Sequence, residues 1–160
     1  METILQNMES VLRVRNRKSF FHPMREIGGF KTCPGYCLQN GAFELPGGIN
    51  FTITSQGATS VELVLFKRRQ SEPFAVLPFP DEYRVGSVYS MIVFGLQIDE
   101  FGYAYWIGGP YDPKKGLLYD KKNLLLDPYA RAVAGQSAWG TRPQTGFEYR
   151  GRIVSSNFDW

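Results

Sequence analysis

A chain of 160 residues is long enough for one domain with a sizeable core, whereas a barrel enzyme would need about 250 residues. Apolar residues make up 43% and charged residues 21% of the chain, as in an ordinary globular protein. Aromatic residues are abundant at 15%, and the 17 glycines and 10 prolines imply many turns, which together favour a β-rich fold. The net charge of +3 does not by itself imply a polyanionic partner.

The sequence shows neither a membrane span nor a secretory signal. It has no run of about 18 apolar residues, and its first residues lack a basic region followed by an apolar one. Cys33 and Cys37 are the only cysteines and His22 is the only histidine, so we expect no metal site. We interpret both cysteines as free thiols in a reducing cytoplasm, with a disulfide or a shared metal as the alternative.

The first 34 residues differ from the rest and are interpreted as a lead-in. They carry a basic stretch, and weak helical spacing between residues 4 and 14 indicates a short helix or a disordered segment. From residue 41 onward the pattern becomes strand and turn. Alternating or apolar segments predict seven short strands, at 43–45, 49–53, 58–67, 74–79, 87–96, 102–108 and 124–126. Pro78 places the fourth of these at a sheet edge.

A helix start is predicted after the last strand. Asp127 is an N-cap residue, Pro128 suits the first helical position, and Gly135 is a stop signal, so we expect one short helix near 128–134. Seven strands spaced by turns predict an all-β, immunoglobulin-like β-sandwich. The expected organisation is a lead-in at 1–34, the sandwich module at 35–135 and a connector at 136–160.

Two ordered motifs resemble a known family. Residues 102–113 read GYAYWIGGPYDP and residues 122–130 read KNLLLDPYA, and both resemble the pattern of isoamylase-type glycogen debranching enzymes of the α-amylase superfamily. Residues 48–51 and 57–66 resemble the opening strands of the N-terminal module of these enzymes. The similarity covers about residues 35–134 and the last few residues, which resemble the connector before the first barrel strand.

The resemblance implies an ancillary module rather than a catalytic one. The module would pack on the α-amylase-type barrel of the same polypeptide, which hydrolyses α-1,6 branches of glycogen, and it would use no cofactor. The family's catalytic carboxylates belong to the barrel, so we expect no catalytic residue in this chain. Turn chemistry, including an Asx-turn at Asp112, implies a role in folding and docking the module, with direct sugar contact as the alternative, for Gly109, Pro110, Asp112, Pro113, Asp127, Pro128 and Tyr129.

A glycan contact is implied at Tyr111. Glycogen-binding relatives have an aromatic residue at the matching position, a lysine at the position of Ala104, and a tryptophan in the loop that here reads KRRQS at 67–71. The chain therefore keeps one contact and departs at two, which predicts weak α-glucan binding. Trp106 is a second candidate platform if its ring faces outward, although a tryptophan on such a strand is more often an inner or interface residue.

Two alternative functions are also compatible with the sequence. The first is a stand-alone, weak glycogen- or starch-binding module without a catalytic partner. The second is a nucleic-acid binder that uses the basic stretch with Phe20, Phe21 and Phe30 as stacking groups. The ordered sugar-enzyme motifs outweigh a moderate cluster of charges, so no nucleic-acid partner and no membrane contact are expected.

Several predicted strands are apolar on both faces. A two-layer sandwich needs only one apolar face per sheet, so the second set predicts an exposed patch that the barrel would cover. We expect this patch on one sheet, and its burial within the chain would instead indicate a thicker core. The choice between these two outcomes depends on the exposure of five side chains: Val64, Phe66, Ile92, Phe94 and Trp106.

Overall fold

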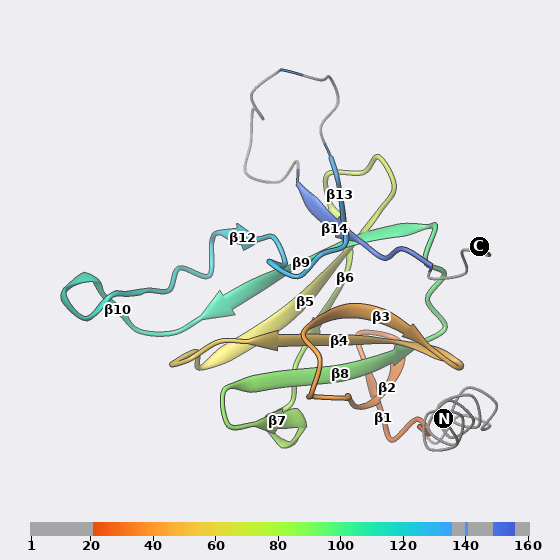
Figure 1. Ribbon diagram of the computed structural model, residues 1–160, viewed down its shortest axis with the longest axis horizontal. Helices are drawn as coiled ribbons and strands as arrows, with labels where there is room; N and C mark the ends of the chain where they lie inside the picture. The colour runs from red at the N-terminus through yellow and green to blue at the C-terminus, as the bar shows by residue number, and fades with distance from the viewer. Residues whose placement is uncertain (1–20, 136–139, 141–148, 156–160) are drawn as a thin grey trace, which may run out of the picture.

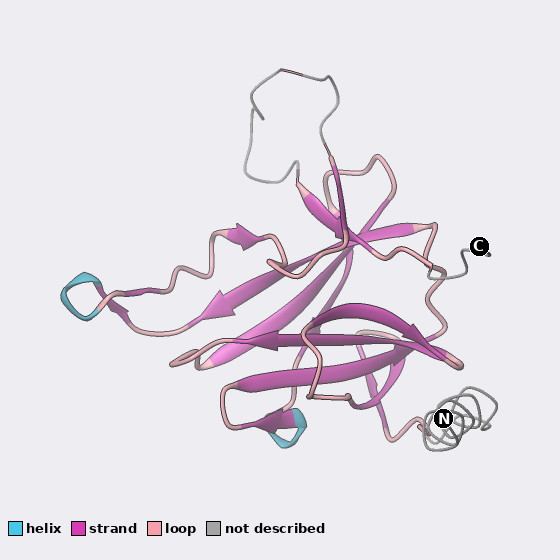
Figure 2. Ribbon diagram, in the orientation of Figure 1, coloured by secondary structure: helices cyan, strands magenta, loops and turns pink. Residues whose placement is uncertain are grey.

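The computed structural model describes residues 21–135, 140 and 149–155. Two antiparallel sheets face each other and enclose one core (Figures 1 and 2), which confirms the predicted β-sandwich. The first sheet has the order β1-β2-β8-β4-β3, with β7 also pairing with β8. Its strands are β1 (Arg25–Ile27), β2 (Phe30–Pro34), β3 (Gly41–Leu45), β4 (Gly48–Thr54), β7 (Arg84–Val85) and β8 (Val88–Phe94).

The second sheet has the order β13-β14-β9-β5-β6, with β12 also pairing with β9. Its strands are β5 (Ser60–Lys67), β6 (Pro73–Pro78), β9 (Phe101–Gly108), β12 (Leu124–Leu125), β13 (Ala132–Ala134) and β14 (Arg150–Arg152). A separate hairpin projects from the sandwich between β9 and β12 (Figure 1). It consists of β10 (Tyr111–Asp112), the 3₁₀ turn η2 (Pro113–Lys115) and β11 (Leu117–Leu118).

The core lies where the alternating faces of the two sheets meet. Ile49, Phe51 and Ile53 of β4 all point inward, as their spacing predicts. Phe51 packs edge-on against Tyr103 of the opposite sheet, with the ring centroids 5.3 Å apart. Burial of each such side chain contributes about 1.5–3 kcal/mol, and the same pattern continues through β8, β5 and β9.

The loop after β2 covers part of the outer face of the first sheet. Asn50 of β4 is fully buried there, and its Oδ1 accepts a hydrogen bond from the backbone N–H of Tyr36 at 2.7 Å. Thr52 donates to the carbonyl of the same Tyr36 at 3.0 Å. A Cβ on Gly35 would lie 2.5 Å from the backbone nitrogen of Met91, so only glycine lets this loop approach so closely.

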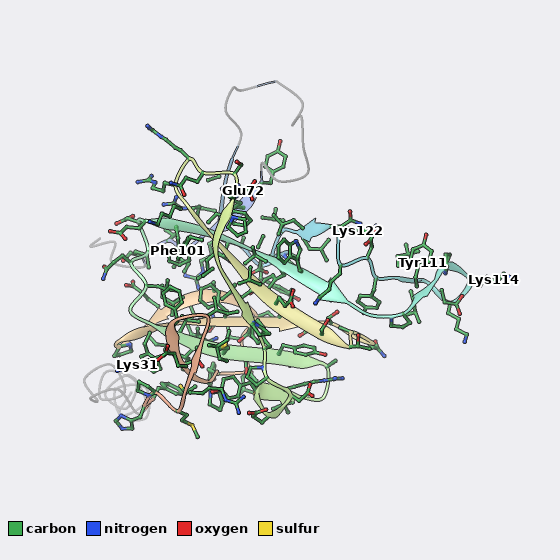
Figure 3. The ribbon with its side chains drawn as sticks, turned by 180° about the vertical axis from the view of Figure 1, so that it is seen from behind. Lys31, Glu72, Phe101, Tyr111, Lys114 and Lys122 are labelled. Atoms are coloured by element: carbon green, nitrogen blue, oxygen red, sulfur yellow. The ribbon has the colours of Figure 1, made fainter. Side chains whose placement is uncertain are left out.

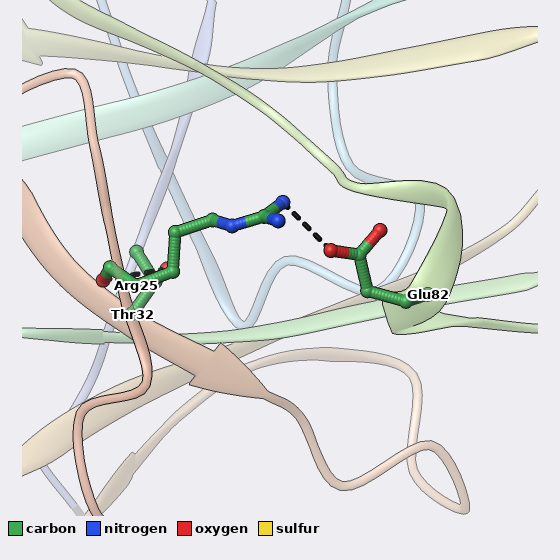
Figure 4. A network of polar contacts seen from close by, with 3 residues as sticks. All are labelled: Arg25, Thr32 and Glu82. Atoms are coloured by element: carbon green, nitrogen blue, oxygen red, sulfur yellow. Dashed lines mark hydrogen bonds and ion pairs between the residues drawn. The ribbon is translucent and has the colours of Figure 1, made fainter.

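The sheet region begins and ends outside the boundaries expected from the sequence. β1 and β2 lie in residues 25–34, which we assigned to the lead-in, and β14 lies in the expected connector. An ion pair of 2.7 Å between Arg25 of β1 and Glu82 of the 3₁₀ turn η1 (Asp81–Tyr83) ties the first hairpin to the sandwich (Figure 4). Thr32 also donates to the carbonyl of Arg25 across this hairpin, at 3.3 Å.

The predicted helix near 128–134 is wrong. Asp127 does accept from the backbone N–H of Tyr129 at 2.8 Å, but this bond closes a turn and no helix follows. The residues after the turn form β13, because β14 offers its backbone hydrogen bonds to them. The capping signal at Asp127 therefore marks a turn. The residues after this turn form a strand instead of a helix, because they pair with β14, which is distant in sequence. The predicted helix or disorder within residues 4–14 lies outside the described residues.

Both cysteines are free thiols, as predicted, with Cys33 buried in β2 and Cys37 in the following loop. Burial raises the pKa of the Cys33 thiol. The described residues hold no group of three or more His, Cys, Asp or Glu side chains placed to bind a metal ion. The same part of the chain has no helix that is long and apolar enough to cross a membrane.

Candidate functional site

Trp106 lies on the outer face of the second sheet. Tyr103, Tyr105 and Ile107 of β9 point into the core, so Ala104 and Trp106 point the other way. Trp106 packs against a small apolar cluster on this face, which consists of Val64, Phe66 and Ala104 with Val76 and Leu124 at its margin. The tryptophan is half-buried, and its indole Nε1–H is buried without an acceptor in the described part of the chain.

The predicted exposed patch on one sheet is largely wrong. Val64, Phe66 and Ile92 are all buried within their own chain, while Phe94 and Trp106 remain half-buried. On the second sheet the apolar cluster forms a thin second core, and the guanidinium of Arg150 lies over the Phe66 ring at 3.8 Å. The second apolar face of β5 is therefore buried mainly by other residues of the same chain.

Tyr111 lies on the projecting hairpin, far from the sandwich core (Figure 3). Its side chain is 69% exposed, and its β-pair partner is Leu118, which is also exposed. The tip of the hairpin turns through η2, where Gly116 adopts the left-handed conformation with φ of 74°. The Asx-turn expected at Asp112 is absent from this described tip, where the Asp112 carboxylate instead pairs with Lys115 at 3.6 Å.

The base of the hairpin is fixed by Tyr119. A Cβ on Gly109 would lie 2.6 Å from Cγ of Tyr119, so the glycine makes room for the ring. The Tyr119 hydroxyl donates to the Gln56 carbonyl and lies 3.2 Å from the hydroxyl of Ser55, both in the loop between β4 and β5. The hairpin therefore projects from a held base, which fixes the direction in which Tyr111 is presented.

A hollow of about 300 Å³ lies between this hairpin and the end of the second sheet. Its wall combines the Tyr119 ring with amide and carboxylate groups, and the remaining lining is aliphatic. The polar groups belong to Gln56, Asp120 and Asn123. No sequence pattern predicted this hollow, and the aromatic and polar residue types at 119–123 are its only local signal.

Asp127 is buried at 2% exposure, and its carboxylate is held by two hydrogen bonds. Its Oδ2 accepts from the Tyr103 hydroxyl at 2.8 Å, and its Oδ1 accepts from the backbone of Tyr129. Burial raises the pKa of the Asp127 carboxyl, which the two hydrogen bonds only partly offset. The pKa of Tyr103 is raised by burial and by the nearby carboxylate. This network fastens the turn at Asp127 to β9.

The structure does not bring the two candidate aromatic platforms into one surface. Trp106 belongs to the apolar cluster on the second sheet, whereas Tyr111 lies on the projecting hairpin. Gly109 and Pro110 join the two, and Pro113 begins η2. Pro128 and Tyr129 lie in the turn after Asp127 and are both exposed. The residues expected to shape or dock the module thus lie at the two ends of the segment that follows β9: at the projecting hairpin and in the turn after β12.

The architecture is an immunoglobulin-like β-sandwich with a projecting hairpin and exposed aromatic side chains. Residues 39–130 match the family of carbohydrate-binding module 48, the isoamylase N-terminal domain. The chain belongs to this family, which confirms the resemblance carried by the GYAYWIGGPYDP and LLLDPYA motifs.

Full-length relatives show the same relationship. The chain is 33% identical over 140 residues to the chloroplastic isoamylase 3 of rice. This alignment covers 82% of the chain and 18% of the relative. It is 39% identical over 138 residues to the glycogen debranching enzyme of Serratia proteamaculans. This alignment covers 79% of the chain and 20% of the relative. The chain therefore spans about a fifth of the length of these relatives.

Solved structures share the fold. The GBS pullulanase SAP in complex with maltotetraose aligns with a TM-score of 0.55 and 20% identity, over 75% of this chain and 15% of that chain. The glycogen-degrading pneumococcal virulence factor SpuA aligns with a TM-score of 0.55 and 16% identity, over 76% of this chain and 12% of that chain. At these identities the likeness concerns the sandwich fold alone.

Proposed function

We propose that the chain is the N-terminal ancillary module of a glycogen debranching enzyme. The observation that carries the proposal is its membership of the carbohydrate-binding module 48 family, together with 39% identity to a glycogen debranching enzyme. In this proposal the α-amylase-type barrel of the same polypeptide hydrolyses α-1,6 bonds, and the module packs on it. The module supplies no catalytic residue and holds no cofactor. The parent acts in the cytoplasm, without a nucleic-acid or membrane partner.

The exposed apolar side chains support a docking role for the segment beside β9. Five of the twelve large exposed apolar side chains of the described residues lie in residues 117–133, among them Leu118 at 65%, Tyr129 at 55% and Val133 at 50% exposure. Leu125 and Leu126 are also exposed in this segment. Apolar groups gathered in one stretch favour an interface with a partner domain. We therefore place the barrel contact along this segment rather than on a sheet face.

A direct contact with α-glucan is proposed at Tyr111. An exposed aromatic face on a firmly held hairpin suits stacking on a sugar ring, and a pre-positioned ring loses little freedom on binding. Trp106 is a secondary candidate, because its indole N–H, which has no acceptor in the described part of the chain, could donate a hydrogen bond to a ligand oxygen. One or two stacking contacts of about 1 kcal/mol each support weak binding only.

The alternative proposal is a stand-alone, weak glycogen- or starch-binding module. It rests on the same Tyr111 exposure and needs no docking partner. The nucleic-acid alternative has less support, because Phe30 packs edge-on against Phe74, with ring centroids 6.2 Å apart, and belongs to the core margin. Phe20 lies outside the described residues.

The glycan contact is tested by Tyr111→Ala. We expect this change to weaken maltoheptaose binding about fivefold, the loss of one stacking contact of about 1 kcal/mol. Calorimetry or NMR titration of the 160-residue chain would measure it. Tyr36→Ala is the matched control, because Tyr36 is an exposed tyrosine in the loop over the first sheet. Equal affinity of the Tyr111 variant and the unchanged chain would place the contact elsewhere, and a submicromolar Kd would contradict weak binding.

The chain alone is expected to show no hydrolase activity. Three carboxylates of the described residues have structural contacts: Asp112 pairs with Lys115, Asp127 is bound to Tyr103, and Asp120 stabilises a turn. Incubation of the purified chain with glycogen limit dextrin should release no maltooligosaccharide above the buffer control. Release that survives repurification and disappears in a carboxylate variant would overturn the assignment as a non-catalytic module.

A further inference from the structure

Four arginines meet at the end of the second sheet opposite the hairpin. Arg68 and Arg69 lie in the loop between β5 and β6, and Arg150 and Arg152 alternate along β14. The strand register places these arginines at the start of β9. Lys67, next to Arg68, pairs with Phe101, and Gly151, between the two strand arginines, pairs with Tyr103. Figure 3 shows this end near the labels of Phe101 and Glu72, away from Tyr111 and Lys114.

Hydrogen bonds hold the strand arginines against the loop. The guanidinium of Arg150 donates through Nη1 to the carbonyl of Gln70 and through Nη2 to that of Ser71, at 3.3 Å for the latter. The same guanidinium is stacked on Phe66. Arg152 donates to the carbonyl of Asp99 at 3.3 Å. Backbone carbonyls therefore position two of the four guanidinium groups. Because these acceptors are neutral, they do not cancel the positive charge.

No carboxylate neutralises this cluster within the described residues. The ion pairs found there involve Arg25, Lys115 and Lys121, and none involves the four arginines. Arg68 and Arg69 are exposed, and their side chains have no partner in the described part of the chain. The neighbouring loops carry Glu72, Asp99 and Glu100, which offset the positive charge in part without pairing.

The arginines also act on one another. The pKa of Arg152 is lowered by burial and by the positive charge of Arg68, and the nearby Asp99 carboxylate offsets this in part. The pKa of Arg150 is lowered by burial, and its Nε–H is buried without an acceptor in the described residues. A bound dianion would relieve the repulsion and satisfy free donors, and the planar guanidinium matches phosphate oxygens in pairs.

We propose that Arg68, Arg69, Arg150 and Arg152 form a binding site for a phosphate monoester. The monoester carries about −1.5 to −2 charges at neutral pH, which suits a cluster with several unpaired cations better than a single carboxylate does. The group arrives either as a phosphate ester on an α-glucan or as a free phosphate or sugar phosphate. This site does not depend on the glucan contact proposed at Tyr111, because the two lie at opposite ends of the sheet.

The test is an NMR titration of the 160-residue chain that follows the arginine Nε–H resonances. Inorganic phosphate, glucose 6-phosphate, a phosphorylated maltooligosaccharide and its unphosphorylated counterpart are the ligands, with acetate as the anion control. We expect saturable shifts with the first three, centred on the four arginines, and none with acetate. A tighter response to the phosphorylated oligosaccharide identifies the glucan ester as the source, and equal responses identify the free phosphate group.

A charge-matched pair of variants separates a site from bulk charge. Arg68→Gln/Arg69→Gln should weaken phosphate binding about tenfold, whereas Lys114→Gln/Lys122→Gln, at the hairpin end, should leave it unchanged. Equal weakening by both pairs, the absence of saturable shifts, or shifts seen only with a single-stranded oligonucleotide would overturn the proposal. Binding of the unphosphorylated glucan at Tyr111 is measured in the same series, so failure of one site is distinguishable from failure of the other.

Discussion

Replacement of Asp127 by alanine is expected to lower the free energy of unfolding by about 3 kcal/mol, because it removes the partner of two donors near the core. The Tyr103 hydroxyl would lose its 2.8 Å hydrogen bond, and the backbone N–H of Tyr129 would lose its acceptor. The turn at 127–130 would then lose its attachment to β9. Urea denaturation followed by circular dichroism measures the change.

Asp120→Ala is the matched control for this prediction. Asp120 forms the same kind of turn, with its Oδ1 accepting from the backbone of Lys122 at 3.0 Å, but it is exposed. We expect a loss below about 1 kcal/mol, because water replaces the missing acceptor. Comparable losses in both variants would mean that the turn, and not the buried contact with Tyr103, supplies the stability.

The pH dependence of stability gives a second readout of Asp127. Burial raises the pKa of this carboxyl above its usual value of 3.8, so the folded state binds its proton more tightly than the unfolded chain. Its contribution is therefore most favourable below the unfolded pKa and declines as the pH rises through the folded pKa. Asp127→Asn should remove this decline, which is measured by urea denaturation across the acidic range. If the stability of the variant declined with pH as steeply as that of the unchanged chain, the decline would not come from Asp127.

Asn50→Ala is expected to cost about 3 kcal/mol of stability. The fully buried amide accepts from the backbone of Tyr36 and donates to the Thr52 hydroxyl at 2.8 Å, so its loss leaves buried polar groups without partners. The loop over the first sheet should also loosen. Thermal and urea unfolding measure the stability, and amide hydrogen exchange at Tyr36 reports on the loop directly.

Asn40→Ala serves as its control, because Asn40 accepts one exposed hydrogen bond, from Thr54 at 3.0 Å. A loss below about 0.5 kcal/mol is expected there. If Asn50→Ala proved equally mild, with unchanged exchange at Tyr36, the loop would be held by packing rather than by the amide.

The strands were predictable because their signals are local. The alternation of Ile49, Phe51 and Ile53 is a property of five consecutive residues, and the structure confirms their inward orientation. The signal at Asp127 is also local, but its outcome is not: Tyr103 binds the carboxylate, and β14 pairs with the residues where a helix was expected. Pairing with a strand so far along the chain leaves no trace in the local pattern.

The candidate site was predictable to the same extent. Turn residues around Tyr111 indicated an exposed loop, and the side chain is exposed. The contact between the Tyr119 hydroxyl and the Gln56 carbonyl joins residues 63 positions apart, and that between Arg150 and Gln70 joins residues 80 apart. The hollow and the arginine cluster depend on such distant contacts, which only the folded chain reveals.

The prolines of β6 bear on how the module avoids aggregation. β6 is an outer strand of the second sheet, paired on one side with β5. Pro73 and Pro78 stand at its two ends, so these two positions of the strand lack an N–H for another strand to bind. A bulge in β5 between Leu65 and Phe66 makes the pairing with β6 irregular. This edge of the open β-sandwich is thereby a poor template for the addition of a strand from another molecule.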